Sequence, residues 1–258
     1  WRVELDVRAR TPRANMTYAN RSVIGRVVIL TPDDEARQQY TIRDMAEDAA
    51  GLLGALGGPR AHVVGLSMGG AIAQELAIGF PQMVDRLVLL ATFDAGDPRA
   101  TELFRGFASL RKQLSREDVL RLTLPWTYTY KDYQIPGLID QMVQERVDDP
   151  LFQEPEAYQR QMEATIAFHS RDRLHLISSP TLLVYGEDDI LTPLRFAREL
   201  VRGIQGSRLV ILEGVGHSFL RTRTREAAAL IDAFLRQGQG PAPTLFTGNL
   251  QANQAQGS

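Results

Sequence analysis

The sequence predicts an α/β fold, in which a mostly parallel sheet is flanked by helices and carries a helical insertion. Short segments rich in Val, Ile and Leu alternate with stretches of helical spacing, which is the order of a sheet with helices on its faces. The apolar segments are nearly continuous, as expected of parallel strands that are buried on both faces. This alternation is interrupted between about residues 93 and 170, where the sequence is helical with loops.

The apolar segments are the predicted strands. They comprise residues 23–30, 62–66, 86–91, 181–186 and 208–212. Between them, helical patterns begin at residues 41, 68, 193 and 225. The predicted domains are a core of residues 1–92 and 171–236, a helical cap of residues 93–170, and a tail of residues 237–258. The tail is rich in Gly, Pro, Gln and Asn, so we expect it to be mobile.

Composition limits the classes of function. The 29 basic residues nearly cancel the 31 acidic ones, so neither nucleic acid nor an anionic membrane is an expected partner. Cys is absent, which excludes disulfides and thiolate catalysis, and the 4 His are too scattered for a metal motif. We therefore expect a small-molecule substrate, no metal and no cofactor. The first residues show no signal-peptide core and no segment has the length of a membrane span, which predicts a cytoplasmic protein.

Residues 61–77, AHVVGLSMGGAIAQELA, predict a sharp turn between a buried strand and a helix. Ser67 occupies this turn within Gly-Leu-Ser-Met-Gly, and its small neighbours let the turn close. A turn of this kind exposes one hydroxyl, which makes Ser67 a candidate nucleophile. Serine between glycines is also common in ordinary loops, so the motif by itself leaves that alternative open.

Two later loops offer the partners that an activated serine needs. One strand ends at Gly186 and is followed by Glu187, Asp188 and Asp189, and another leads through glycines to His217. Because the carboxyl ends of parallel strands line one edge of a sheet, an acid from the first loop and His217 can converge on the serine. A lone acidic loop is usually solvated and a lone histidine is often structural, but the three together are much harder to obtain by chance.

Four stretches of the sequence match motifs of one family and follow one another in the same order. They are YTIRDMAEDAAGLLGALG, HVVGLSMGGAIAQELA, PTLLVYGEDDILTP and LEGVGHSF. From about Tyr40 to Leu235 the chain resembles the α/β-hydrolase superfamily, in particular its capped serine esterase and lactonase branch, with 3-oxoadipate enol-lactonase-like and carboxylesterase-like proteins. The resemblance implies that Ser67 is the nucleophile and His217 the general base. It also implies that Asp189, the fourth residue of G-x-x-D-x-x-x-P, orients the histidine.

The implied function is a serine hydrolase that cleaves a small, largely apolar carboxylic ester or lactone through an acyl-enzyme. One alternative is a carbon-carbon bond hydrolase or a cofactor-free perhydrolase that uses the same triad. Another is a non-catalytic ligand-binding module, or a truncated hydrolase that lacks a complete oxyanion hole. The substrate itself and the oligomeric state do not follow from the sequence.

The oxyanion hole is where the sequence departs from the family. The backbone N–H of Met68 is one expected donor, but the His-Gly turn that supplies the other donor in the family does not occur before Ser67. The stretch WRVELDVRAR resembles a later family strand, which suggests that the chain begins inside the domain. Residues 23–30 are either an insertion without an assigned role or a substitute for the oxyanion strand. In the second case residues 25–30 pair in parallel with 62–66, and the backbone of Asp33 is the second donor.

An aromatic cluster within the predicted cap has two open interpretations. It includes Trp126, Tyr128 and Tyr130. Aromatic rings of this kind serve equally in packing the cap against the core and in contacting a substrate. The expected site therefore includes these three residues as candidate substrate contacts.

Overall fold

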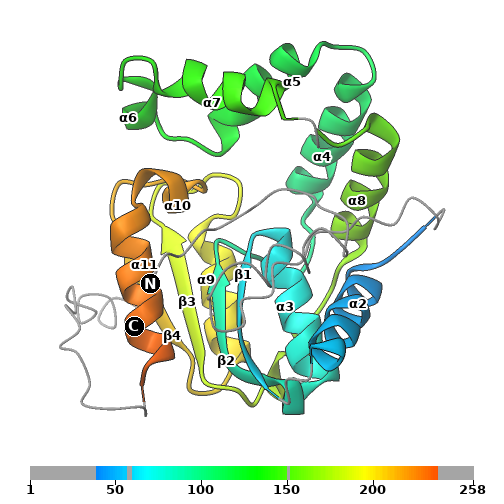
Figure 1. Ribbon diagram of the computed structural model, residues 1–258, viewed down its shortest axis with the longest axis vertical. Coiled ribbons are helices and arrows are strands. Elements are labelled where there is room, and N and C mark those ends of the chain that lie inside the picture. The colour runs from blue at the N-terminus through cyan, green and yellow to red at the C-terminus, as the bar shows by residue number, and fades with distance from the viewer. Residues whose placement is uncertain (1–38, 57–59, 150–151, 238–258) are drawn as a thin grey trace, which may run out of the picture.

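The computed structural model describes residues 39–56, 60–149 and 152–237 (Figure 1). Within these residues the sheet is parallel, with 4 strands in the order β1-β2-β3-β4. The strands are β1 (Ala61–Leu66), β2 (Val84–Leu90), β3 (Thr181–Gly186) and β4 (Arg208–Leu212). The predicted α/β class is therefore confirmed. The strand predicted at residues 23–30, its pairing with β1 and the tail beyond Gln237 lie outside the described residues.

Four helices around the sheet begin close to the predicted positions, namely α2 (Ile42–Ala55), α3 (Met68–Gly79), α9 (Leu194–Gly203) and α11 (Thr224–Leu235). The short helix α10 (Phe219–Thr222) was not predicted. At the start of α2, a capping box fixes the first turn: the Thr41 hydroxyl accepts from the Asp44 N–H, and the Asp44 carboxylate accepts from the Thr41 N–H. Short 3₁₀ turns occur at Pro81–Met83 and Arg171–Leu176.

Alternate side chains of the strands build one apolar layer on each face of the sheet. On one face, Leu87 and Leu183 pack with α2, α3 and α9. On the other face, Val88 and Val184 pack with α10 and α11, and Figure 1 shows α11 and α3 on opposite sides of the sheet. All residues of β3 and the last four of β2 are buried, and burial on both faces explains why these two strands are nearly continuously apolar there.

The helical insertion lies between β2 and β3. Its helices are α4 (Pro98–Arg111), α5 (Arg116–Thr123), α6 (Tyr130–Tyr133), α7 (Leu138–Val147) and α8 (Pro155–Ala167), with a 3₁₀ turn at Leu124–Trp126. Figure 1 shows α5, α6 and α7 beyond the end of the sheet toward which the strands point. The insertion thus lies over the edge at which Ser67 is found.

The two chain segments that lead into and out of the insertion pair with each other. Ala95 and His169 form an antiparallel bridge, and the Ser170 N–H donates to the Asp94 carbonyl over 2.7 Å. This short pairing brings the two ends of the insertion together at one place. The division into a core and a cap domain remains a prediction.

Helix α3 anchors this junction through buried polar side chains. The Gln74 amide donates to the Phe93 carbonyl over 3.0 Å and accepts from the Ser170 hydroxyl over 2.8 Å. The next residue of α3, Glu75, accepts two hydrogen bonds from Arg173. Since Gln74 and Ser170 are both fully buried, their hydrogen bonds are costly to break. The helix that follows Ser67 therefore also holds the base of the insertion.

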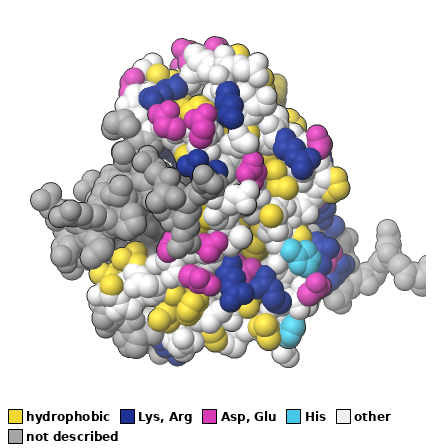
Figure 2. Space-filling model, turned by 90° about the vertical axis from the view of Figure 1, so that its right-hand side faces the viewer, with side chains coloured by type: hydrophobic (Ala, Val, Ile, Leu, Met, Phe, Trp, Pro, Cys, Tyr) yellow, Lys and Arg dark blue, Asp and Glu magenta, His cyan; other side chains and the backbone are white. Residues whose placement is uncertain are grey.

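The surface carries charges of both signs. On the face shown in Figure 2, basic and acidic side chains lie interspersed among apolar ones. Among the helices in the described ranges, none is long and apolar enough to cross a membrane.

Candidate active site

Ser67 lies on a strained turn between β1 and α3. Its φ of 53° and ψ of −120° are unusual for a residue with a side chain. The Ser67 N–H donates to the Leu90 carbonyl over 2.8 Å, and the Ser67 carbonyl accepts from the Thr92 hydroxyl over 2.6 Å. Both backbone groups are thus occupied, and the strain is held by neighbouring structure, as is common at functional sites.

The turn closes because the glycines beside Ser67 lack side chains. A Cβ at Gly65 would lie 2.3 Å from the Gly69 carbonyl oxygen, and one at Gly70 would lie 2.5 Å from the Thr92 side chain. A Cβ at Gly69 would meet no atom within 4 Å. The first glycine of the motif is therefore required by packing, whereas the second is not.

Asp189 follows β3 and is only 2% exposed. Its Oδ1 accepts from the backbone N–H groups of Leu191 and Thr192, over 2.9 and 2.8 Å. Its Oδ2 accepts from the Thr192 hydroxyl over 2.6 Å and lies 2.8 Å from His217 Nδ1. Burial by itself would raise the pKa of the carboxyl, but the hydrogen bonds from His217 and Thr192 outweigh it and hold the pKa below its ordinary value.

The neighbouring acid does not share this environment. Asp188 is exposed, and its backbone N–H donates to the Val215 carbonyl over 3.0 Å. The carboxylate against the ring of His217 is that of Asp189, which is the residue that the family spacing favoured. The catalytic role of this pair remains a prediction.

His217 is buried in the loop after β4, and this loop packs tightly on the end of β3. A Cβ at Gly186 would lie 2.3 Å from the Val215 carbonyl oxygen, so only glycine lets the two segments approach. The insertion also contacts the loop, because the Ser218 N–H donates to the Thr127 carbonyl over 2.9 Å. The position of His217 therefore depends on the core and on the insertion.

Ser67, Asp189 and His217 come from the carboxyl ends of β1, β3 and β4, which share one edge of the sheet. Within the described part of the chain, the Ser67 hydroxyl forms no hydrogen bond with His217. Such contacts are often long without a substrate and tighten in the complex. Met68 is the first residue of α3, so its N–H has no acceptor within the helix, and its role as an oxyanion donor remains a prediction. Asp33, the predicted second donor, lies outside the described residues.

The three aromatic candidates lie in different environments. Tyr128 is 8% exposed and packs in an apolar cluster of the insertion. Trp126 stands edge-on to Phe107, and the Arg99 guanidinium lies 5.9 Å from its ring centroid. Tyr130 is 78% exposed, and its hydroxyl accepts from Gln134. Packing accounts for Tyr128, and contact with a substrate remains a prediction for all three aromatic residues.

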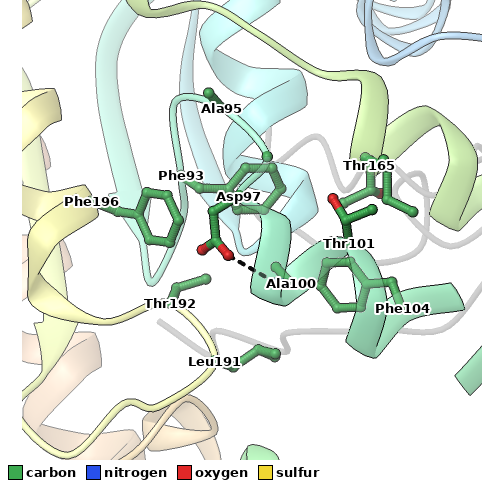
Figure 3. A pocket seen from close by; sticks show the side chains of 12 residues that line it. Phe93, Ala95, Asp97, Ala100, Thr101, Phe104, Thr165, Leu191, Thr192 and Phe196 are labelled. Atoms are coloured by element: carbon green, nitrogen blue, oxygen red, sulfur yellow. Dashed lines mark hydrogen bonds between the residues drawn. The ribbon is translucent and has the colours of Figure 1, made fainter. Parts of the chain in front are cut away.

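A recess lies between the base of the insertion and the loop that carries Asp189 (Figure 3). Its lining is mainly apolar and includes Phe93, Ala100, Phe104, Leu191 and Phe196, together with the methyl-bearing side chain of Thr192. The cavity itself is small, about 20 Å³, and it opens to solvent. The sequence did not predict this recess, because its walls come from segments that are far apart in the sequence.

The Asp97 carboxylate in this recess caps the N-terminus of α4. As Figure 3 shows, it accepts from the Ala100 N–H, over 2.8 Å, and it also pairs with Arg195. Burial would raise the pKa of Asp97, but these hydrogen bonds lower it. In the ranges that the structure describes, no cluster of His, Asp and Glu could hold a metal ion.

Comparison with known proteins identifies the family of the chain. The model of the alpha/beta hydrolase family matches residues 8–230. The chain belongs to the alpha/beta hydrolase family. The resemblance inferred from the four motifs is thereby confirmed.

Relatives of this hydrolase carry several activities. A poly(3-hydroxyalkanoate) depolymerase of Ectopseudomonas oleovorans is 32% identical over 203 residues, which are 78% of this chain and 70% of that protein. A 2-hydroxy-6-oxononadienedioate/2-hydroxy-6-oxononatrienedioate hydrolase of a Pseudomonas species is 27% identical over 180 residues, 67% of this chain and 62% of that protein. The solved enol-lactonase of Burkholderia xenovorans LB400 matches with a TM-score of 0.69 at 26% identity, covering 78% of this chain and 75% of its own.

Proposed function

We propose that this protein is a serine hydrolase that cleaves a small, largely apolar carboxylic ester or lactone through an acyl-enzyme on Ser67. The observation that carries the proposal is the hydrogen bond of 2.8 Å between Asp189 and His217 Nδ1, at the sheet edge that also presents Ser67. A buried histidine whose Nδ1 faces a carboxylate presents its other nitrogen, Nε2, as a base. That is the arrangement that an activated serine requires.

The mechanism follows from these positions. Ser67 Oγ attacks the carbonyl carbon of the substrate while His217 Nε2 accepts the hydroxyl proton. The ionised Asp189 stabilises the imidazolium that forms, and His217 then gives the proton to the leaving alkoxide. A water molecule, deprotonated in the same way, releases the acid from Ser67.

Charge on the tetrahedral intermediate requires donors near Ser67. The Met68 N–H is favourable because it lies at the N-terminus of α3, where the helix dipole stabilises negative charge. One donor of this kind typically contributes about 10²- to 10³-fold in turnover. The second donor is assigned, as a proposal, to the backbone of Asp33.

The preference for an apolar substrate rests on the recess beside Asp189. Its walls are Phe93, Phe104 and Phe196 with aliphatic neighbours, and such a surface gains free energy by covering an apolar group. The insertion forms part of this wall through Ala100 and Phe104. We therefore assign the insertion the role of a cap that helps to select the substrate.

Carbon-carbon bond hydrolysis is the second candidate. It is favoured by the likeness to the Pseudomonas hydrolase, whose name describes a substrate with two carboxylates and a keto group. The same Ser67, His217 and Asp189 would serve this reaction. The apolar lining of the recess favours the ester or lactone instead.

A panel of chromogenic esters tests the proposal. The panel contains acetyl, butyryl and octanoyl esters of one phenol, an aliphatic lactone and a vinylogous diketone acid. We expect cleavage of at least one ester or the lactone, and none by Ser67→Ala. Cleavage of the diketone acid alone would favour the second candidate. No turnover, with tight binding of an ester analogue, would favour a ligand-binding module instead.

A further inference from the structure

Thr192 stands in contact with both members of the acid-base pair. Its Oγ1 lies 2.6 Å from Asp189 Oδ2 and 3.1 Å from His217 Nδ1, and these two atoms are 2.8 Å apart. The three polar atoms thus form a closed triangle. Thr192 is only 3% exposed, so water does not compete with these contacts.

The protons in this triangle can be assigned from the chemistry of the groups. An ionised carboxylate only accepts, so the short contact requires the Thr192 hydroxyl to donate to Asp189. The lone pairs of the same hydroxyl are then left to face His217 Nδ1. Both neighbours of Nδ1 are acceptors, and a ring nitrogen without a proton would be repelled by both. The proton therefore resides on Nδ1, and the lone pair of the ring resides on Nε2.

We infer that Thr192 is a positioning residue for His217, which holds the ring in the tautomer and orientation that a general base needs. The inference rests on the proposed function. It adds a residue that the sequence motifs did not mark, because the position before Pro193 carries no catalytic signature. Thr192 acts through Asp189 and His217 and does not contact the reacting atoms.

The local backbone holds Thr192 in this place. Its N–H donates to Asp189 Oδ1 over 2.8 Å, as does that of Leu191 over 2.9 Å. Pro193 follows as the residue that precedes the first turn of α9, and its ring limits the backbone of Thr192 to extended conformations. The hydroxyl is thereby directed to the triangle, while the side chain also lines the recess.

The Thr192 hydroxyl also affects the negative charge on the Asp189 carboxylate that faces His217. By donating to Oδ2, it takes up part of the negative charge that otherwise stabilises the imidazolium. Removal of this donor leaves more negative charge on the carboxylate, which then stabilises the imidazolium more strongly. The acidic limb of the pH profile of kcat/KM is expected to move upward by up to about one pH unit.

The other charged or titratable groups near the two loops are unchanged when only Thr192 is substituted. Glu187 accepts from the Gly214 N–H over 3.1 Å, and the Lys131 ammonium lies close to Gly214. Tyr128 interacts with the Ser218 side chain, and Tyr185 interacts electrostatically with Asp189. A shift of the acidic limb on substitution at Thr192 alone is therefore attributed to the triangle.

The experiment compares Thr192→Val with Thr192→Ser and Thr181→Val. Valine keeps the shape of threonine but removes the hydroxyl, and serine keeps the hydroxyl. Thr181 is a matched control, because it is also buried and its hydroxyl also donates one hydrogen bond, to the Ser179 carbonyl, at the opposite end of β3. For each variant, kcat and KM are measured across pH on the ester that the protein cleaves, with a thermal melt as a check of folding.

We expect Thr192→Val to lower kcat about 10-fold or more with little change in KM, since small errors in orientation are costly in catalysis. Its acidic limb should move to higher pH, and Thr192→Ser should restore both. Thr181→Val should alter neither. An unshifted limb in Thr192→Val, or equal losses in the serine variant, would overturn the inference. If Thr192→Val does not fold, Thr192→Ala takes its place in the same comparison.

The outcome is separable from that of the proposed function. If Ser67→Ala retains activity, then the nucleophile is wrong, whatever Thr192 does. If Ser67→Ala is inactive and Thr192→Val matches the unchanged protein in kcat and pH profile, then only the inference about Thr192 fails.

Discussion

The turn that carries Ser67 and the loops that carry Asp189 and His217 are held in place in different ways. Ser67 is fixed by its backbone, through a φ of 53° and through glycines that leave no space for a Cβ. Asp189 and His217 are fixed by side-chain hydrogen bonds that include charge. Added atoms should therefore disrupt the first region, whereas loss of a donor or a charge should disrupt the second while its fold persists.

In the loops that carry Asp189 and His217, the largest effect on rate is expected at Asp189. Asp189→Asn keeps the size of the side chain but offers an amide that can stabilise the wrong tautomer of His217, and kcat should fall by about 10⁴-fold. Ester hydrolysis at saturating substrate measures this loss, and a far-ultraviolet circular-dichroism spectrum checks that the fold persists.

Asp188→Asn is the matched control, because Asp188 is the exposed neighbour in the same loop. Its activity should stay close to that of the unchanged protein. Equal losses in the two variants would mean that the hydrogen bond to His217 does not distinguish the two acids.

The next largest effect is expected at the glycines of the turn. Gly65→Ala places a Cβ 2.3 Å from the Gly69 carbonyl oxygen, and overpacking of this kind typically costs about 1–3 kcal/mol in the free energy of unfolding. Gly69→Ala adds a Cβ in open space within α3 and should be neutral or stabilising by up to about 1 kcal/mol. Denaturant unfolding of both variants measures the contrast, and an equal loss at Gly69 would contradict the packing described for the turn.

A smaller effect concerns pH and stability. Because the folded pKa of Asp189 lies below its unfolded value, the carboxylate stabilises the fold fully above the unfolded pKa of about 3.9. This contribution is lost as the pH falls through the lower, folded pKa. The difference in melting temperature between the protein and Asp189→Asn should be constant near neutrality and shrink in strong acid. A difference in melting temperature that grows on acidification would show that the pKa of Asp189 is shifted in the opposite direction.

The smallest effect is expected at Tyr130 in the insertion. Its side chain is 78% exposed, and substitution at such a position usually changes stability by less than about 0.5 kcal/mol. Tyr130→Ala should leave melting temperature, kcat and KM unchanged, whereas Tyr128→Ala, at 8% exposure, should cost about 3 kcal/mol or more. A rise in KM for Tyr130→Ala alone would instead favour its predicted role as a substrate contact.

The sheet and the turn could be predicted because their signals are local. Strands β1 to β4 are continuous apolar segments, and the turn at Ser67 combines glycines with a switch from strand to helical spacing. The choice of Asp189 over Asp188 also followed from spacing. The structure gives its physical reason: the N–H groups of Leu191 and Thr192 draw the Asp189 carboxylate inward.

The contacts around the site could not be predicted, since they join residues that are distant in sequence or depend on side-chain rotamers. Gln74 and Ser170 meet across 96 positions of the chain. The triangle of Thr192 depends on where one hydroxyl points, and Tyr128 and Tyr130 differ in burial although both belong to one aromatic cluster. The hypothesis for residues 23–30 and for Asp33 stays a prediction, as does the cytoplasmic location.

Activation of Ser67 by His217 is tested most directly by labelling with a fluorophosphonate, which reacts quickly only with an activated serine. Mass spectrometry of the labelled protein should place one adduct on Ser67. The rate of labelling should fall by orders of magnitude in His217→Ala and Asp189→Asn but not in Asp188→Asn. An adduct on another residue, or labelling of Ser67 at the same rate without His217, would contradict the proposed catalytic arrangement.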